Sequence, residues 1–127
     1  MKPILLFLIT GLLCWSCYPT SPKVSHSVGL KEKDTLSYEL IIIDPGFDTW
    51  YDIHFSPAKD RSNEAYHMYN QQAVLNWNYY FTTGKHSQYI DSYINYENQV
   101  DYGIELNRKL YWYFKYVEEI SGLRLFN

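Results

Sequence analysis

The sequence predicts an α+β domain in which a small sheet of two or three strands packs against two longer helices. Three observations predict it: a strand-like run near residue 40 and two long stretches in which apolar residues recur every three or four positions. With 127 residues, 46% of them hydrophobic and 20% charged, the chain can form one small core. We assign this domain to residues 36–127, after a signal peptide at 1–16 and a flexible tether at 17–35.

The first 16 residues have the layout of a secretory signal peptide. Lys2 supplies one positive charge, and residues 4–15 are apolar except for one Thr and one Gly. This run is shorter than the about 20 apolar residues that span a bilayer. The small residue Ser16 stands directly before Cys17, as at the end of a bacterial lipoprotein signal. We therefore expect cleavage before Cys17 and attachment of lipid to its thiol.

The positions of the cysteines agree with export from the cytosol. Both cysteines, Cys14 and Cys17, precede the predicted domain, which therefore has no thiol to oxidise. The alternatives are a plain signal peptide or an uncleaved anchor. No acidic run follows Cys17 as a tag for surface export, so we expect attachment to the outer membrane on its periplasmic side. Three acyl chains, typical of bacterial lipoproteins, would make that attachment permanent.

The segment after Cys17 has the composition of a tether. Residues 18–30 contain Pro, Ser and Gly with few large apolar groups, and the charges of residues 31–34 alternate. Such a segment cannot offset its ordering entropy by burial, so we expect it to be flexible, with His26 solvated.

Residues 36–44 form the clearest predicted strand. From Leu40 to Ile43 both of its faces are apolar, which is typical of a central strand covered on two sides. Pro45 and Gly46 then end it in a type II turn, in which Gly46 supplies the positive φ. Asp48 is the expected cap of a short helical turn, and Ser56-Pro57 the start of another.

A long helix is predicted from Ser62, its N-cap, to Phe81, and residues 82–85 end it. The positions opposite its apolar side are largely Asn and Gln. The inner side is predicted to contain Tyr66, Tyr69, Ala73, Trp77 and Tyr80.

Two further elements complete the domain. Residues 88–96 alternate in the manner of a short strand with one drier side. A final helix is predicted to be capped by Asp101 and to end at Gly122 in the left-handed conformation, with residues 123–126 as an edge strand. Its inner side is predicted to contain Leu106, Leu110, Tyr113, Phe114, Val117 and Ile120.

Four stretches are similar to a known family. They are residues 38–50 (YELIIIDPGFDTW), 76–78 (NWN), 101–107 (DYGIELN) and 110–114 (LYWYF). Together they resemble a family of small lipoproteins from Gram-negative bacteria, domain of unknown function 6146, over residues 36–126. The resemblance implies an envelope location and the extent of the domain, and it implies no reaction and no catalytic residue.

Asp44 and Asp48 are the most prominent pair of carboxylates. Across a tight turn they could bind a cation or share a proton, but a strand end and a helix cap account for both residues. Adding Asp52 places a second carboxylate one helical turn after Asp48, without the Gly-centred loop of calcium sites. We therefore predict structural roles and retain Asp44 and Asp48 as possible partner contacts.

Other chemistry has little support in the sequence. No two histidines stand at i, i+4, and Glu64-x-x-His67 lacks the second copy that a di-metal site requires, so no metal ligand is predicted. The sequence also lacks a Gly-x-Ser-x-Gly elbow and a glycine-rich phosphate loop, and no cofactor is predicted. The net charge of −3 argues against nucleic acid as a partner.

Aromatic residues make up 19% of the chain, which is its most unusual property. Exposed rings could form a surface that stacks on sugars or peptides, and otherwise they fill the core. Helical spacing places Trp77 and Tyr80 inward and leaves Tyr79 and Trp112 outside the buried sides. Tyr79 and Trp112 are therefore the predicted contact residues.

The leading hypothesis is a non-catalytic envelope module, held at the membrane by lipid, that contacts another protein or the cell wall. The first alternative is a domain that binds glycan or peptidoglycan through exposed aromatic rings. The second is a hydrolase that uses Asp44, Asp48 and Glu105 as acid and base.

Overall fold

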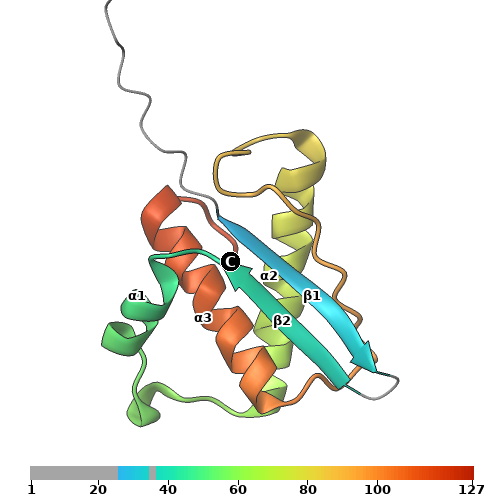
Figure 1. Ribbon diagram of the computed structural model, residues 1–127, viewed down its shortest axis with the longest axis vertical. Coiled ribbons are helices and arrows are strands. Elements are labelled where there is room, and N and C mark those ends of the chain that lie inside the picture. The colour runs from blue at the N-terminus through green and yellow to red at the C-terminus, as the bar shows by residue number, and fades with distance from the viewer. Residues whose placement is uncertain (1–25, 35–36) are drawn as a thin grey trace, which may run out of the picture.

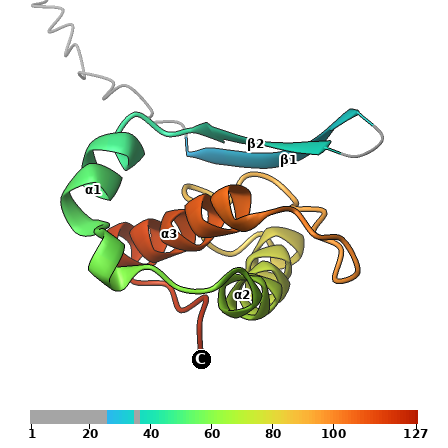
Figure 2. The same cartoon turned by 90° about the horizontal axis from the view of Figure 1, so that it is seen from below.

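The computed structural model describes residues 26–34 and 37–127. It has two layers, with a two-stranded antiparallel sheet on one side and two long helices on the other, which confirms the predicted α+β class (Figures 1 and 2). The predicted signal peptide and Cys17 lie outside the described residues. The elements are β1 (Ser27–Asp34), β2 (Ser37–Ile43), α1 (Phe47–His54), a 3₁₀ turn (Pro57–Lys59), α2 (Asn63–Thr83) and α3 (Ile104–Ser121).

Strand β1 lies where the composition predicted a tether, so that prediction is wrong for residues 27–34. β1 pairs with β2 in a register that runs from Ser27 opposite Ile43 to Glu32 opposite Tyr38. Val28 is fully buried, and the ladder satisfies backbone groups that a tether would leave to water. Burial and pairing together offset the ordering entropy, so the folded domain begins before residue 36.

Strand β2 confirms the predicted strand, but it is not a central strand. The sheet has two strands, and the helices cover only one of its faces (Figure 2). On the outer face, Ile41 is 39% exposed and Ile43 is 58% exposed. The apolar residues at this end of β2 therefore extend onto an open surface.

The turn after β2 differs from the predicted type II turn. Gly46 has φ −89° and ψ −15°, so it does not supply a positive φ. Glycine is required for another reason, because a Cβ atom at this position would lie 2.6 Å from the hydroxyl oxygen of Tyr116. Gly46 is also the N-cap of α1, and Asp48 lies in the first turn rather than at the cap.

Helix α2 begins and ends as its sequence predicts. The Ser62 hydroxyl accepts a hydrogen bond from the backbone N–H of Ala65 at 3.1 Å, and Gly84 ends the helix with φ 69°. Trp77 is fully buried, as expected. Asn70 is fully buried as well, so the amide residues of α2 are not confined to a solvated face.

Residues 88–96 form no strand, which corrects the prediction. Ile90 and Ile94 are buried, so the alternation correctly identified the drier side. Side chains of α2 take the place of a neighbouring strand: Asn78 accepts from the N–H of Ile94 at 2.9 Å and donates to its carbonyl at 2.8 Å. The indole N–H of Trp77 donates to the carbonyl of Ser92 at 2.7 Å.

Helix α3 has Gly103 as its N-cap, so Asp101 is not the cap. The Asp101 carboxylate accepts from the N–H of Gly103 at 3.0 Å and from the side chain of Asn63 at 3.1 Å. These bonds lower the pKa of Asp101 and connect the starts of α2 and α3. At the other end Gly122 has the predicted left-handed conformation, with φ 73°.

The C-terminal residues form no edge strand, contrary to the prediction. The backbone N–H groups of Leu125 and Phe126 donate to the carboxylate of Glu118, at 2.9 and 3.2 Å. The carbonyl of Leu125 accepts from the side chain of Asn76 at 2.7 Å. Side chains of α2 and α3 thus make the hydrogen bonds that the backbone of this segment needs, and Leu125 is fully buried.

Replacing Asn78 tests whether side chains of α2 stabilise residues 88–96 through hydrogen bonds to their backbone. Asn78→Ala removes both bonds to the buried Ile94, and we expect the free energy of unfolding to fall by about 1–3 kcal/mol. Chemical denaturation measures the change. The exposed Asn95→Ala is the control, and an equal loss in both variants would contradict a specific role for Asn78.

Candidate functional site

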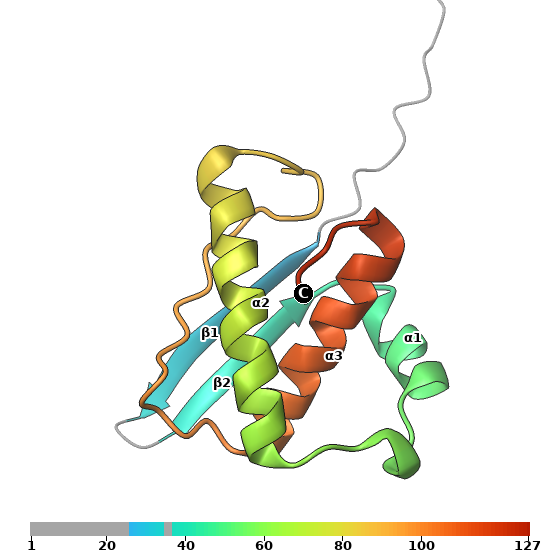
Figure 3. The same ribbon diagram turned by 180° about the vertical axis from the view of Figure 1, so that it is seen from behind.

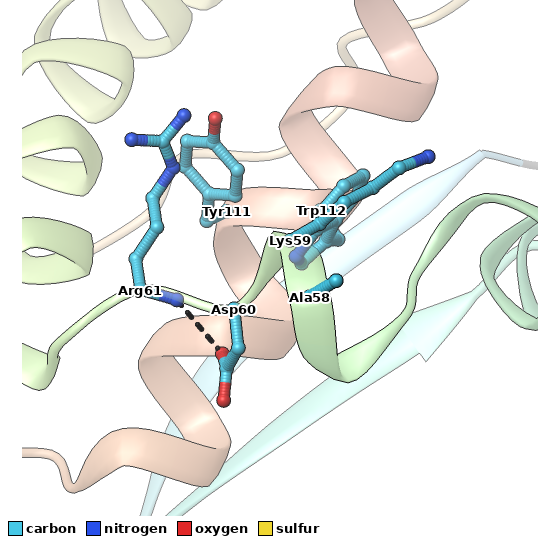
Figure 4. A pocket seen from close by; sticks show the side chains of 6 residues that line it. All are labelled: Ala58, Lys59, Asp60, Arg61, Tyr111 and Trp112. Carbon is cyan, nitrogen blue, oxygen red and sulfur yellow. Dashed lines mark hydrogen bonds between the residues drawn. The ribbon is translucent and has the colours of Figure 1, made fainter.

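A pocket of about 360 Å³ opens between the 3₁₀ turn, the two residues that follow it and the middle of α3 (Figure 4). We call it the basic-aromatic pocket, after the chemistry of its walls. It is lined by Ala58, Lys59, Asp60, Arg61, Tyr111 and Trp112.

Local sequence places three consecutive charged residues at this pocket. Pro57 begins the 3₁₀ turn, and the backbone N–H of Asp60 closes it with a bond to the Pro57 carbonyl at 3.2 Å. Ser62 then caps α2, so the chain between these two elements is short and extended. Lys59, Asp60 and Arg61 therefore stand beside the same stretch of α3 (Figure 4).

Asp60 is held by partners within the fold. Arg108 of α3 donates to both of its carboxylate oxygens, at 2.9 and 2.7 Å, and the hydroxyl of Tyr66 donates at 2.6 Å. The bonds from Arg108 and then Tyr66 lower the pKa of Asp60 to about 2. The acid is thus ionised and neutralised by Arg108, which leaves the nearby cations uncompensated.

Arg61 and Lys59 supply positive charge at the pocket. The guanidinium carbon of Arg61 lies 5.1 Å from the ring centre of Tyr69 and 5.6 Å from that of Tyr111. Within the described residues, no carboxylate lies within ion-pair distance of Arg61 or Lys59. The ammonium of Lys59 donates to the backbone carbonyl of His54 at 2.9 Å. Both cations can therefore bind a further anionic group.

The aromatic wall consists of Tyr111 and Trp112, whose rings meet edge to face at 5.7 Å. The ring centres of Phe55 and Trp112 lie 5.7 Å apart, also edge to face, so Phe55 packs against Trp112. Trp112 is half-buried, so it keeps a surface toward the pocket. The predicted contact residue Trp112 thus belongs to this site. Tyr79 is 57% exposed on α2 and does not line it.

The structure gives Asp44 and Asp48 different surroundings. Asp44 is buried, and it accepts from Tyr116 at 2.9 Å and from the N–H of Gly46 at 3.2 Å. Nδ1 of His26 lies 2.6 Å from the other Asp44 oxygen, so His26 is not the solvated histidine that was predicted. The Asp48 side chain is 83% exposed and lies 3.7 Å from Lys109.

This buried cluster joins the start of β1 to α3. Burial, and then the bond to Asp44, raise the pKa of Tyr116, so its hydroxyl remains protonated and donates. His26 precedes β1, Asp44 follows β2 and Tyr116 lies on α3. This structural role accounts for the cluster, because it fixes the open end of the hairpin, where β1 begins and β2 ends, on α3.

A second pocket, of about 350 Å³, lies near the start of α2 and includes His67, Met68, Asn98 and Asp101. Its polar groups bond mainly to one another. Nδ1 of His67 lies 2.7 Å from the hydroxyl of Tyr96, and Nε2 lies 3.0 Å from the carbonyl of Asn98. The basic-aromatic pocket is therefore the better candidate, since its cations are not neutralised.

In residues 26–34 and 37–127 no group of three or more His, Cys, Asp or Glu side chains is placed to hold a metal ion. Over the same residues no helix has the length and apolar character to cross a bilayer.

Sequence reasoning missed Lys59, Asp60, Arg61 and Arg108. The available signal was the run Lys-Asp-Arg directly before the cap of α2. The run did not reveal that Asp60 pairs with a residue 48 positions later. Without that pairing, Asp60 offsets one of the two cations, and the run does not indicate a basic site.

The Asp60–Arg108 pair predicts a pH dependence of stability. The folded pKa of Asp60 lies below its ordinary value of 3.8, so folding favours the ionised form. Its stabilisation is complete above about pH 4 and is lost as the pH falls toward 2. We expect the stability difference between the native protein and Asp60→Asn to shrink over this interval in urea titrations. Asp48→Asn, at an exposed position, should change stability little, and a pH-independent effect of Asp60→Asn would contradict the prediction.

The comparisons with known proteins yield a family. Its model, described as "Family of unknown function (DUF6146)", matches residues 4–127 and agrees with the resemblance noted in the sequence. No curated protein and no solved structure matches the chain. Because the match extends over nearly the entire sequence, the chain belongs to the DUF6146 family of unknown function.

Proposed function

We propose that this protein is a non-catalytic contact module of the bacterial cell envelope, anchored by lipid on Cys17, that binds the cell wall through the basic-aromatic pocket. The observation that carries the proposal is the pair of uncompensated cations, Arg61 and Lys59, beside the rings of Tyr111 and Trp112. The site fits a carboxylate attached to an apolar or ring-shaped group.

Peptidoglycan has this chemistry, because its short peptides and acidic sugars place carboxylates next to methyl groups and sugar rings. Arg61 would bind the carboxylate with two parallel hydrogen bonds, and Trp112 would cover the adjacent apolar surface. The pocket is open and about 360 Å³ in volume, which suits one such unit of a larger polymer.

The surroundings of Asp60, Asp44 and Asp48 support a binding function rather than a hydrolase. Asp60 is committed to Arg108, and its pKa of about 2 is unsuited to a general acid. Asp44 and Asp48 have separate partners, Tyr116 and Lys109. We therefore retain the contact module as the function and do not propose the carboxylate hydrolase.

The envelope location is supported by the N-terminal sequence. A short apolar run followed by Ser16 and Cys17 is typical of an exported, acylated protein. A domain without cysteine is suited to an oxidising compartment.

Fractionation of cells tests the anchor. We expect the native chain in the membrane fraction and, by intact-mass analysis, a lipid-modified N-terminus at Cys17. Cys17→Ala should abolish the modification, because the acceptor thiol is lost, while Cys14→Ala should leave it unchanged. Unmodified chain that begins at Met1 and stays in the cytosol would contradict the proposed location.

Co-sedimentation with purified peptidoglycan sacculi tests the pocket. We expect the full chain in mild detergent to pellet with sacculi, and Arg61→Gln to weaken that binding about tenfold, because a charge-assisted pair is lost. Salt should weaken binding as well. The control is Lys109→Gln, which removes the same charge from an exposed site outside the pocket. Equal binding by the native chain and Arg61→Gln, or no binding at all, would refute the proposed function.

A further inference from the structure

The outer side of α2 lacks formal charge along nearly its whole length. Between Glu64 and Lys85 the sequence contains no Asp, Glu, Lys or Arg. Met68, Leu75 and Tyr79 are 66%, 74% and 57% exposed, and at about 3.6 residues per turn they lie on one side of the helix. We call these three residues the α2 stripe. In Figure 3 the helix runs across the front of the molecule, and no other element passes over it.

The α2 stripe differs from two other exposed apolar positions, Ile53 and Ile41, which lie beside charged residues. Ile53 is 74% exposed on α1 and directly follows Asp52. Ile41 is 39% exposed on the outer face of the sheet, which also includes Glu39 and its partner Lys31. An interface that used either region would have to desolvate or pair these charges.

We infer that the α2 stripe is the contact between two copies of this chain, related by a two-fold axis that passes close to Leu75. In a two-fold contact each surface meets an identical surface, so a charged face opposes its own charges. The α2 stripe avoids this repulsion. Its length of about 16 Å, from Met68 to Tyr79, matches the side of a helix that one neighbouring helix covers.

Each polar group in or beside the α2 stripe can form a hydrogen bond with the same group of a second copy. Gln72 lies between Met68 and Leu75 on the helix surface, and its amide both donates and accepts hydrogen bonds. The Tyr79 hydroxyl also does both. Such groups can pair with their own copies, whereas ammonium groups and carboxylates need a partner of the opposite charge. The chemistry of this surface thus favours a second copy over a charged partner.

Sedimentation of the full chain in detergent, over a range of concentrations, tests the inference. We expect a reversible dimer, and a dissociation constant raised at least about tenfold by Leu75→Lys or by Leu75→Glu, since each places like charges near the axis. An equimolar mixture of the two variants should regain the dimer, because the charges then attract. The control is Ile53→Lys, at an equally exposed position outside the α2 stripe, which should dimerise normally.

Disulfide crosslinking gives a second measurement. In a full chain with Cys14→Ser and Cys17→Ser, oxidation should convert Leu75→Cys to a covalent dimer and leave Ile53→Cys monomeric.

Several results would overturn the inference. They are a native chain that stays monomeric, Leu75 variants that dimerise normally, and a mixture that does not recover. Loss of binding to phosphatidylethanolamine–phosphatidylglycerol vesicles in Leu75→Lys, without a change in self-association, would assign the α2 stripe to lipid instead. The inference is independent of the pocket, because Arg61→Gln should still dimerise.

Discussion

Side-chain amides on α2 satisfy the backbone of segments that have no regular partner, and the rest of the fold depends on this. Asn78 bonds both backbone groups of Ile94, and Asn76 bonds the carbonyl of Leu125. Buried peptide groups without a partner cost free energy, so a two-stranded sheet could not support these segments alone. One helix therefore replaces the missing strands and allows a small domain to close around an aromatic core.

The two sides of α2 have different roles: the inner side stabilises the fold, and the outer side is the proposed contact surface. The inner side supplies Trp77 to the core and amides to the neighbouring backbone. The outer side exposes Leu75 and has no charged residue between Glu64 and Lys85. A solvated helix ordinarily has charged residues on its outer side, which keep it soluble and separate from its copies. Their absence here is the reason to regard the outer side as an interface.

The basic-aromatic pocket depends on a pairing between distant parts of the chain. Asp60 stands between two cations in the sequence, Lys59 and Arg61. Arg108 pairs with the Asp60 carboxylate, which therefore does not neutralise Lys59 or Arg61. Tyr66, whose pKa is raised by burial and by Asp60, donates the third bond and fixes the acid. What remains at the pocket is positive charge beside aromatic rings, which is why we propose an anionic ligand for it.

Local signals in the sequence determined both long helices, the cap at Ser62, the ends at Gly84 and Gly122, strand β2 and the drier side of residues 88–96. Periodicity and capping act within a few residues, so the sequence alone expresses them. Tertiary structure decided that β1 is a strand, that residues 88–96 are bonded by a helix and that Asp60 is neutralised. Each of these depends on a partner far along the chain, and a local sequence pattern does not indicate which distant residue the fold brings into contact.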